Sequence, residues 1–264
     1  MKVSLIISTY NRVDALELCL RSALRQSRMP DEIIVGDDGS TSDTRALVER
    51  IATEHPEVPI LFEWHEDRGF RLARMRNRCI ARASGDYIIQ IDGDMVLSRH
   101  FVADHLAVAR PGFYVRGSRM RLSEKATRNM LETMKVPRFY SPFYPTLHHD
   151  RLKAVRLPFI GRLLSPGYHR DSTGLGANMA FWREDLLRVN GYDNHFEGWG
   201  GEDNDLEVRL KAAGVKSFKL FRLGMAFHLW HKESPNPHHQ QIVEYINAKA
   251  ARGETVAADG IEQR

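Results

Sequence analysis

Four short apolar runs in the first half of the chain constrain its fold more than any other feature. They occupy residues 3–8, 32–36, 59–64 and 87–91, and none alternates cleanly between apolar and polar side chains. Strands that are apolar on both faces are typical of a parallel sheet covered by helices on both sides. We therefore expect these runs to be strands of such a sheet, and residues 113–117 are a further candidate strand.

The segments between these runs have helical periodicity. Apolar side chains recur at intervals of three or four residues, and the third segment ends at Gly85, a residue type favoured just after a helix. The apolar positions are Val13, Leu16, Leu20 and Leu24; Leu47 and Ile51; and Leu72, Met75, Cys79, Ile80 and Ala83. Strand and helix alternating in this way predict the α/β class, with a doubly wound, Rossmann-like nucleotide-binding half.

The second half of the chain is less regular. Residues 202–214 predict a helix, because acidic residues fill its first turn and Gly214 closes it. Residues 120–170 are rich in proline, arginine and aromatic residues, and we expect long loops with a few helical turns there. The residues after about 240 are polar, and we expect a partly disordered tail.

Charge and cysteine content narrow the class of protein. The net charge of +4 is spread along the chain apart from an arginine-rich stretch at residues 68–84, so a nucleic-acid-binding protein is the least favoured class. Cys19 and Cys79 both fall in predicted helices, which favours a reducing compartment over a disulfide framework. We find no signal peptide and no transmembrane segment, and expect a cytoplasmic protein, with peripheral attachment to the inner membrane left open.

Polar motifs follow each of the first four predicted strands. They are STYNR (8–12), DDGS (37–40), HEDRGF (65–70) and DGD (92–94). Ligands of an open parallel sheet bind beyond the carboxyl ends of its strands, so we expect these motifs to share one edge. Neither a dinucleotide-binding GxGxxG after the first strand nor a P-loop occurs, which makes both of those readings weak.

A divalent cation that neutralises a diphosphate fits these acids better. Asp94 is the natural metal ligand, and Asp92 is then free to bind a sugar hydroxyl or to support the metal. We expect Arg74, in the arginine-rich helix, to point towards the phosphates.

Taken together, STYNR, DDGS, ASGDYIIQIDGD and GWGGEDND resemble the inverting glycosyltransferases of family two, which have the GT-A fold. GWGGEDNDLEVRL and FHLWHKESPNP (227–237) are similar to the C-terminal module of β-1,4-galactosyltransferases and bacterial chondroitin polymerases. The resemblance covers roughly residues 2–237, with the motifs in the expected order. It implies a single GT-A domain over residues 1–240, with a nucleotide-binding half at 1–117, an acceptor and catalytic half at 118–240, and a polar tail at 241–264.

The resemblance also implies ligands. The residues matching the family's nucleotide site are Thr9, Tyr10, Asn11, Arg12, Asp38, Phe70, Asp92 and Gly93, to which Arg74 is added from the helix pattern. The metal would be bound by Asp94, His231 and His228, the last lying where galactosyltransferases have a methionine ligand. Nitrogen ligands favour Mn²⁺, with Mg²⁺ as the alternative.

The catalytic roles follow from the same resemblance. Asp203 would be the base that deprotonates the acceptor hydroxyl, and the charge of the neighbouring Glu202 should favour proton uptake by the pair. Glu202 would also bind a sugar hydroxyl. The loop before them would supply Trp199 as a platform for a sugar ring, and Gly198, Gly200 and Gly201 as a mobile segment that closes over the donor.

We therefore expect transfer of galactose, N-acetylgalactosamine or a related hexose from a UDP-sugar to a glycan or glycolipid acceptor, in bacterial surface polysaccharide synthesis. Asn204 interrupts the run of acids that galactosyltransferases have here, so acceptor contacts should differ. A sugar-1-phosphate nucleotidyltransferase would need a glycine-rich basic loop after the first strand, which STYNRVDA lacks. A non-catalytic nucleotide- or glycan-binding module would have lost Asp94, Asp203 or His231, all of which are present.

Overall fold

The computed structural model describes residues 1–136, 155–168, 176–232 and 239–262. In these residues a seven-stranded sheet has the strand order β3-β2-β1-β4-β8-β6-β9. Strands β1 to β4 are parallel, whereas β8 is antiparallel to β4 and β6. The strands are β1 Val3–Thr9, β2 Glu32–Asp37, β3 Ile60–Trp64, β4 Tyr87–Asp92, β6 Phe113–Arg116, β8 Asn178–Trp182 and β9 Lys216–Lys219.

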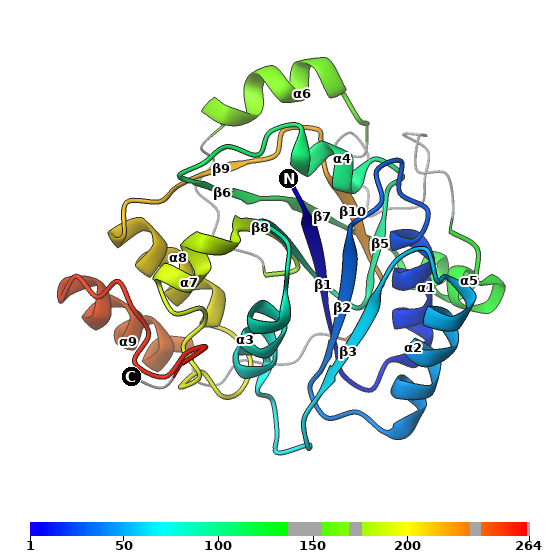
Figure 1. Cartoon of the computed structure of the whole chain (residues 1–264), viewed down its shortest axis with the longest axis horizontal. Coiled ribbons are helices and arrows are strands. Elements are labelled where there is room, and N and C mark those ends of the chain that lie inside the picture. Colours follow the sequence, from blue (N-terminus) through cyan, green and yellow to red (C-terminus); the bar gives the residue numbers. More distant parts are fainter. Residues whose placement is uncertain (137–154, 169–175, 233–238, 263–264) are drawn as a thin grey trace.

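Helices cover both faces of this sheet (Figure 1). One face packs on α1 Val13–Ala23, α2 Ser42–Glu54 and α4 Phe101–Leu106, and the other on α3 Leu72–Arg82, α7 Arg183–Arg188 and α8 Glu202–Ala212. Leu5 and Ile7 belong to the first core and Ile6 to the second, and all three are fully buried. The predicted strands, apolar on both faces, are thus confirmed. Within the described ranges, no helix is long and apolar enough to cross a membrane.

A second, smaller sheet lies beside the carboxyl end of β4. It consists of β5 Met95–Leu97, β10 Met225–His228 and β7 Ser118–Arg121, with β10 antiparallel to β5 and parallel to β7. The long loops expected over residues 120–170 are only partly found. The structure has α5 Glu124–Thr133, α6 Pro158–Leu164 and a 3₁₀ turn at Ser165–Gly167, while residues 137–154 lie outside the described residues.

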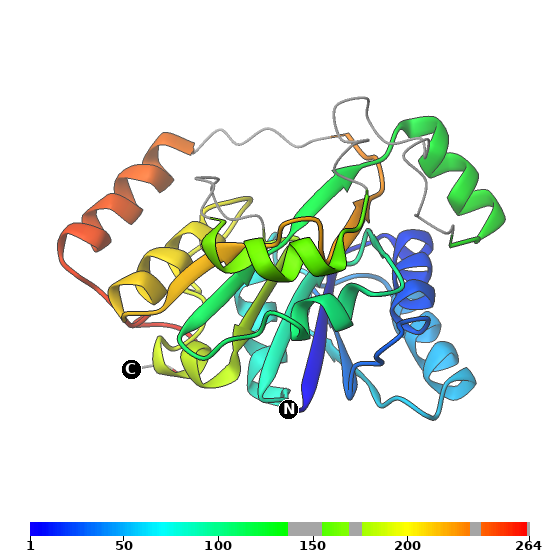
Figure 2. The same cartoon turned by 90° about the horizontal axis from the view of Figure 1, so that it is seen from above.

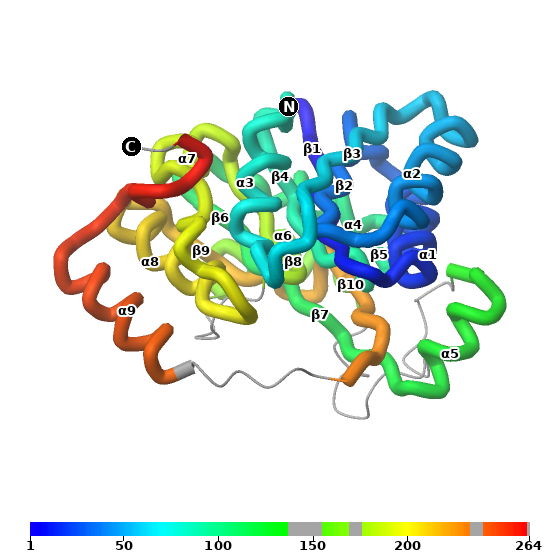
Figure 3. The backbone as a smooth tube through the Cα atoms, turned by 90° about the horizontal axis from the view of Figure 1, so that it is seen from below, coloured from blue at the N-terminus to red at the C-terminus, as the bar shows by residue number. Residues whose placement is uncertain are grey.

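The C-terminal residues differ from the sequence expectation. Residues 239–262 are not a disordered tail: helix α9, His239–Ala251, packs beside α8, and Figure 3 shows it on the outer side of the molecule. Ile246 and Ala257 are buried, and Ile261 packs against the core that α3, α7 and α8 form with the large sheet. The packing of this segment could not be predicted from its polar composition, because buried charges rather than apolar side chains make part of its contacts with the rest of the protein.

Candidate active site

The carboxyl ends of β1, β2 and β4 meet at one edge of the large sheet (Figure 2). The backbone N–H of Asp38 donates to the carbonyl oxygen of Thr9 (3.0 Å), and that of Gly93 donates to the carbonyl oxygen of Ser8 (2.7 Å). These bonds hold STYNR, DDGS and DGD side by side. The motifs therefore share one edge, as a parallel sheet predicts.

Asp94, His228 and His231 form a compact group at this edge. Their possible metal-binding atoms lie within 4.8 Å of one another. The Nε2 atoms of His228 and His231 are 3.5 and 3.3 Å from Asp94 Oδ2. Strand pairing produces the group, because His228 pairs with Met95 and the N–H of Leu229 donates to the carbonyl oxygen of Asp94 (3.0 Å). The structure thus brings together the three residues that the sequence suggests as metal ligands.

The chemistry of this group fits a divalent cation. Asp94 Oδ1 is buried and has no hydrogen-bond partner among the described residues. Burial raises the pKa of Asp94, although Arg12 and His231 act against it. Burial, together with the charge of Arg119, lowers the pKa of His228 to about 4, so its imidazole is neutral at pH 7. Neutral imidazole is the form that binds metals, and two nitrogens with a carboxylate suit Mn²⁺ better than Mg²⁺.

Arg76 lies at the centre of a second group, made of three carboxylates. Its guanidinium nitrogens are 3.2 Å from Asp92 Oδ1, 3.2 Å from Glu202 Oε1 and 2.9 Å from Asp203 Oδ1. The guanidinium is fully buried and lies 5.3 Å from the centre of the Tyr192 ring. Three acids around one cation leave an excess of negative charge, which is unfavourable in a buried place unless a proton or another cation joins it.

The pKa of Glu202 is raised in this group. Burial and the charge of Asp203 raise the pKa of Glu202 to about 8, so this carboxyl is largely protonated at pH 7. Asp203 is oriented by hydrogen bonds from Tyr192 Oη (3.3 Å) and from the N–H of Gly176 (3.0 Å), besides its bond from Arg76. The raised pKa of Glu202 is consistent with the predicted proton uptake by the Glu202–Asp203 pair, which stays a prediction.

Helix α3 points two of its arginines in different directions, and the contact of Arg74 with the phosphates stays a prediction. The Arg74 guanidinium lies 3.4 Å from Asp259 in the C-terminal segment and is partly exposed, and Arg76 is the arginine that reaches the carboxylates. The sequence holds a signal for Arg76, because it lies four residues after Leu72 and four before Ile80 on the apolar stripe of the helix. A charge on a buried face needs buried partners.

Tyr10 and Asp38, assigned to the nucleotide by the resemblance, already have protein partners. Tyr10 Oη donates to Asp67 Oδ2 (2.8 Å). Asp38 Oδ1 pairs with His65 Nε2 (2.6 Å), and Asp38 Oδ2 accepts from the N–H of Arg71 (2.9 Å). Asp38 therefore holds the HEDRGF segment against the ends of β1 and β2, and both of its oxygens are engaged.

Asn11 joins the first two motifs. Its backbone lies in the left-handed region (φ 47°), its N–H donates to Ser40 Oγ (2.7 Å), and its Oδ1 accepts from the N–H of Thr41 (3.3 Å). The next residue, Arg12, reaches Asp94 Oδ2 at 3.0 Å. The turn at Asn11 thus directs Arg12 from the end of β1 to the Asp94 group.

The GWGG loop precedes the two catalytic candidates. Gly198, Gly200 and Gly201 all have φ between 89° and 99°, a backbone that other residues rarely adopt, and Gly201 is the N-cap of α8. The N–H of Gly198 donates to the carbonyl oxygen of Phe70 (2.8 Å), so this loop touches the HEDRGF segment. Trp199 is 55% exposed and is therefore free to contact a ligand rather than packed in the core.

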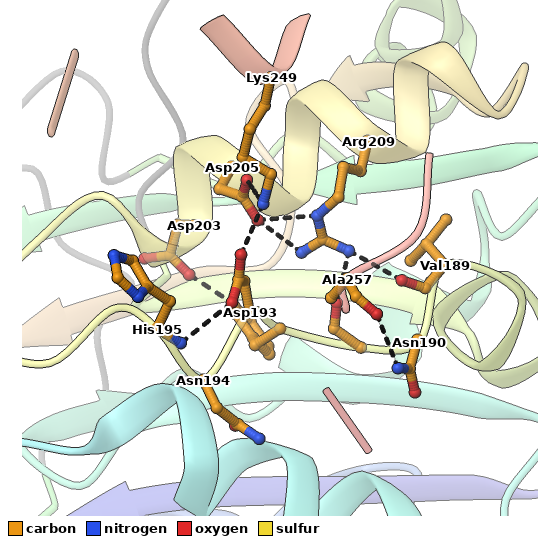
Figure 4. Close-up of polar contacts among 12 residues, drawn as sticks. Val189, Asn190, Asp193, Asn194, His195, Asp203, Asp205, Arg209, Lys249 and Ala257 are labelled. Carbon is orange, nitrogen blue, oxygen red and sulfur yellow. Dashed lines mark hydrogen bonds and ion pairs between the residues drawn. The ribbon is translucent and has the colours of Figure 1, made fainter. Parts of the chain in front are cut away.

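A third group of charges ties α9 to α8 (Figure 4). Lys249 Nζ lies 2.6 Å from Asp193 Oδ2 and 2.7 Å from Asp205 Oδ1. Arg209 pairs with Asp205 (2.6 Å) and donates to the carbonyl oxygens of Val189 and Gly191. Sequence reasoning missed this group, because nothing local to α9 shows that Lys249 is buried.

Solved structures with the same fold are glycosyltransferases. A mannosyltransferase from Pyrobaculum calidifontis, in complex with GDP-Man and Mn²⁺, has a TM-score of 0.63 at 22% identity, covering 95% of this chain and 64% of that one. GalNAc-T7 with UDP, GalNAc and Mn²⁺ has a TM-score of 0.64 at 15% identity, covering 100% and 53%. The fold is therefore the GT-A fold of nucleotide-sugar-dependent glycosyltransferases, as the sequence predicts.

The sequence places the chain in a family within this class. The model for "Glycosyl transferase family 2" matches residues 4–162, and that for "N-terminal domain of galactosyltransferase" matches residues 160–232. The chain belongs to glycosyl transferase family 2.

Curated relatives agree with this assignment. Chondroitin synthase of Escherichia coli is 29% identical over 251 residues, 86% of this chain and 34% of the relative. Validoxylamine A glucosyltransferase of Streptomyces hygroscopicus subsp. limoneus is 28% identical over 235 residues, 81% of this chain and 48% of the relative. The chain thus spans between a third and a half of the length of these relatives.

Proposed function

We propose that this glycosyltransferase is a metal-dependent inverting hexosyltransferase that uses a UDP-sugar and a glycan or glycolipid hydroxyl as acceptor. The observation that carries the proposal is the pairing of two groups at one sheet edge. Asp94 with its two histidines follows β4 directly, and Asp92, two residues earlier, contacts the Arg76 group that contains Asp203. The candidate cation site therefore contains one acid of the DGD motif, Asp94, and the group with the candidate base contains the other, Asp92.

Asp94, His228 and His231 would hold the cation, which we propose to be Mn²⁺. When bound, it would stabilise the negative charge that develops on the departing diphosphate. Arg12, now paired with Asp94, lies at the same place and can turn its guanidinium to a diphosphate oxygen once Asp94 binds metal. Thr9, Gly93 and Asn11 form the backbone edge on which the nucleotide would lie, with Tyr10 and Phe70 as exposed rings nearby.

Asp203 would act as the base. The acceptor O–H gives its proton to the Asp203 carboxylate while its oxygen bonds to the anomeric carbon, and the electron pair of the breaking carbon–oxygen bond goes to the diphosphate. Attack from the face opposite the leaving group inverts that carbon. The bonds from Arg76, Tyr192 and Gly176 fix the carboxylate in position, and Glu202, which holds a proton, can donate a hydrogen bond to a sugar oxygen.

Residues 1–117 would bind the nucleotide, and residues 118–240 would supply the acceptor side and catalysis. Trp199 would lie against a sugar face, with Gly200 and Gly201 allowing its loop to close. The match to chondroitin synthase supports a polysaccharide acceptor and a role in bacterial surface polysaccharide synthesis.

A donor panel tests the proposal. The enzyme is incubated with UDP-galactose, UDP-N-acetylgalactosamine, UDP-glucose and GDP-mannose, with Mn²⁺ or EDTA, and release of nucleoside diphosphate is measured. We expect one UDP-hexose to be consumed with Mn²⁺ only, and a product of inverted anomeric configuration by NMR when an oligosaccharide acceptor is added. A retained configuration, preference for GDP-mannose, or equal rates in EDTA would contradict the proposal.

A further inference from the structure

Helix α6 and the 3₁₀ turn that follows it pack on the protein through small residues. Gly161 and Ser165 are buried against residues 219–223, and a Cβ added at Gly161 would lie 2.6 Å from the carbonyl oxygen of Phe221. Ser165 Oγ accepts from the N–H of Phe221 (3.0 Å). The backbone of α6 therefore approaches this segment closely, and its large side chains have no room on the inner side.

The large apolar side chains of α6 face outward instead. Phe159 is 82% exposed and Leu163 72%, while Ile160 and Leu164 are each nearly half exposed. The pairs 159/163 and 160/164 are four residues apart, so the four side chains form one continuous strip. Four of the eleven exposed large apolar side chains among the described residues thus lie in one seven-residue helix. Single exposed apolar residues are ordinary, but a contiguous strip marks an interaction surface.

The surroundings of this strip are basic. The N–H of Leu157 donates to the carbonyl oxygen of Arg222, and the N–H of Lys219 donates to that of Tyr168, both at 3.1 Å, so residues 155–168 lie along β9 and its extension. These two segments, 155–168 and 216–223, contain five basic residues and no acidic one. One of the five, Arg156, pairs with the buried Asp104 of α4 (2.6 Å), and the surface charge therefore comes from the other four. Strand β9 is also the edge strand of the large sheet, and Figure 1 shows α6 outside it.

We propose that α6 and the β9 edge form a docking surface for an anionic lipid bilayer. The helix would lie in the plane of the interface with Phe159 and Leu163 inserted among the acyl chains, and Arg162, Lys216 and Arg222 would face the headgroups. Attachment of this kind is peripheral. It does not depend on the sugar donor, the metal or the base, and so stands apart from the proposed reaction.

The charges favour a bilayer over a second copy of the chain. A symmetric contact through α6 would bring the same basic residues of two copies face to face, which is unfavourable. An anionic bilayer accounts for both the apolar strip and the basic residues, because it takes up apolar side chains and attracts the arginines and lysines beside them.

Vesicle sedimentation tests the proposal. The protein is mixed with vesicles of phosphatidylcholine alone, or of phosphatidylcholine and phosphatidylglycerol in equal amounts, and the bound fraction is measured. We expect binding to the anionic vesicles that weakens with added salt, and little binding to phosphatidylcholine. The double variant Phe159→Ser/Leu163→Ser should bind roughly tenfold weaker or more, since each side chain contributes by apolar burial.

Two further variants complete the experiment. Arg162→Glu should lower binding to the anionic vesicles only, and Val243→Ser, which removes an exposed apolar residue from α9, should bind like the unchanged protein. Circular dichroism confirms that each variant is folded. Wild-type protein that stays in the supernatant, or a double variant that sediments as fully as wild type, would overturn the proposal. So would a dimer that dissociates in the double variant without any vesicle binding, because it would assign the strip to a second copy.

Discussion

Helix α8 contributes to two buried groups of charges that differ in their charge balance. Asp205, with Asp193, faces two cations, Lys249 and Arg209, so that group is electrically balanced. Closer to the helix start, Glu202 and Asp203 together with Asp92 pair with one cation, Arg76, within the described part of the chain.

This difference in charge balance suggests a structural role for the first group and a chemical role for the second. A balanced buried group needs nothing from outside, and it holds α9 and the loop at Asp193 in place. A group with excess negative charge must take up a proton or lie near a cation, and the raised pKa of Glu202 reflects this. Perturbed carboxyls of this kind gather at functional sites. Changes in the first group should therefore alter stability, and changes in the second should alter activity.

The largest effect should come from Asp203→Asn. Loss of a general base typically slows a reaction by about 10²–10⁴-fold, and we expect sugar transfer to fall by at least that much. UDP affinity and the melting temperature should change little, because the excess charge is reduced and not increased. Steady-state kinetics and calorimetry measure these, with the exposed Asp43→Asn as control. Turnover within threefold of wild type would remove Asp203 as the base.

Lys249→Met tests the balanced group. It leaves Asp193 and Asp205 buried with too little positive charge, and breaking a buried ion pair in this way costs about 3–5 kcal/mol. We expect the free energy of unfolding, measured in urea, to fall by that amount. The matched control is Lys211→Met on the exposed side of α8, which should change stability by less than about 0.5 kcal/mol. Equal stability of the two variants would contradict a structural role for the Lys249 group.

His231→Ala tests whether His231 is a ligand of the proposed metal site at Asp94. Removing a direct ligand should weaken Mn²⁺ binding in the presence of UDP by more than the ~10–100-fold that outer partners of a metal site contribute. Isothermal titration of Mn²⁺ measures this, and His228→Ala should behave alike. The control is His55→Ala, which removes an exposed histidine outside the proposed metal site and should leave the Mn²⁺ affinity unchanged. A His231→Ala protein with the affinity of that control would exclude His231 from the metal site.

The smallest effect concerns the pH dependence of stability. The pKa of Glu202 is raised from 4.5 to about 8 by burial and by Asp203, so the folded protein binds this proton more tightly than the unfolded chain does. Its contribution to stability is therefore complete below pH 4.5 and is lost as the pH rises through about 8. In Glu202→Gln, urea unfolding without added metal should show a shallower decline over this range. Glu49→Gln on the surface should keep the wild-type slope, and an unchanged slope in Glu202→Gln would place the proton elsewhere.

The sequence predicted what local patterns and motif order can encode. Strands β1 to β4 were predictable because their apolar runs are short and lack alternation. The resemblance to family two glycosyltransferases and galactosyltransferases implied the grouping of Asp94 with His228 and His231. The sharing of one sheet edge followed from the parallel topology alone.

The parts that were missed depend on tertiary contacts. Arg76 was passed over for Arg74, although Arg76 lies on the apolar stripe of α3 and only burial decides between them. Helix α9 looked like a polar tail because its attachment uses Lys249, whose partners come from distant parts of the chain. The outward apolar strip of α6 lies in a segment whose prolines and arginines predict loops.

The central claim is that Asp94, His228 and His231 bind a divalent cation together with UDP. The most direct test is thermal unfolding of the wild-type protein with UDP, in Mn²⁺, Mg²⁺ or EDTA. Ligand at about 100 times its dissociation constant adds about 2.7 kcal/mol, which for a chain of this size raises the melting temperature by several degrees. The account predicts this rise with UDP and Mn²⁺, a smaller rise with Mg²⁺, and none in EDTA. A rise of the same size in EDTA, or no rise under any condition, would contradict it.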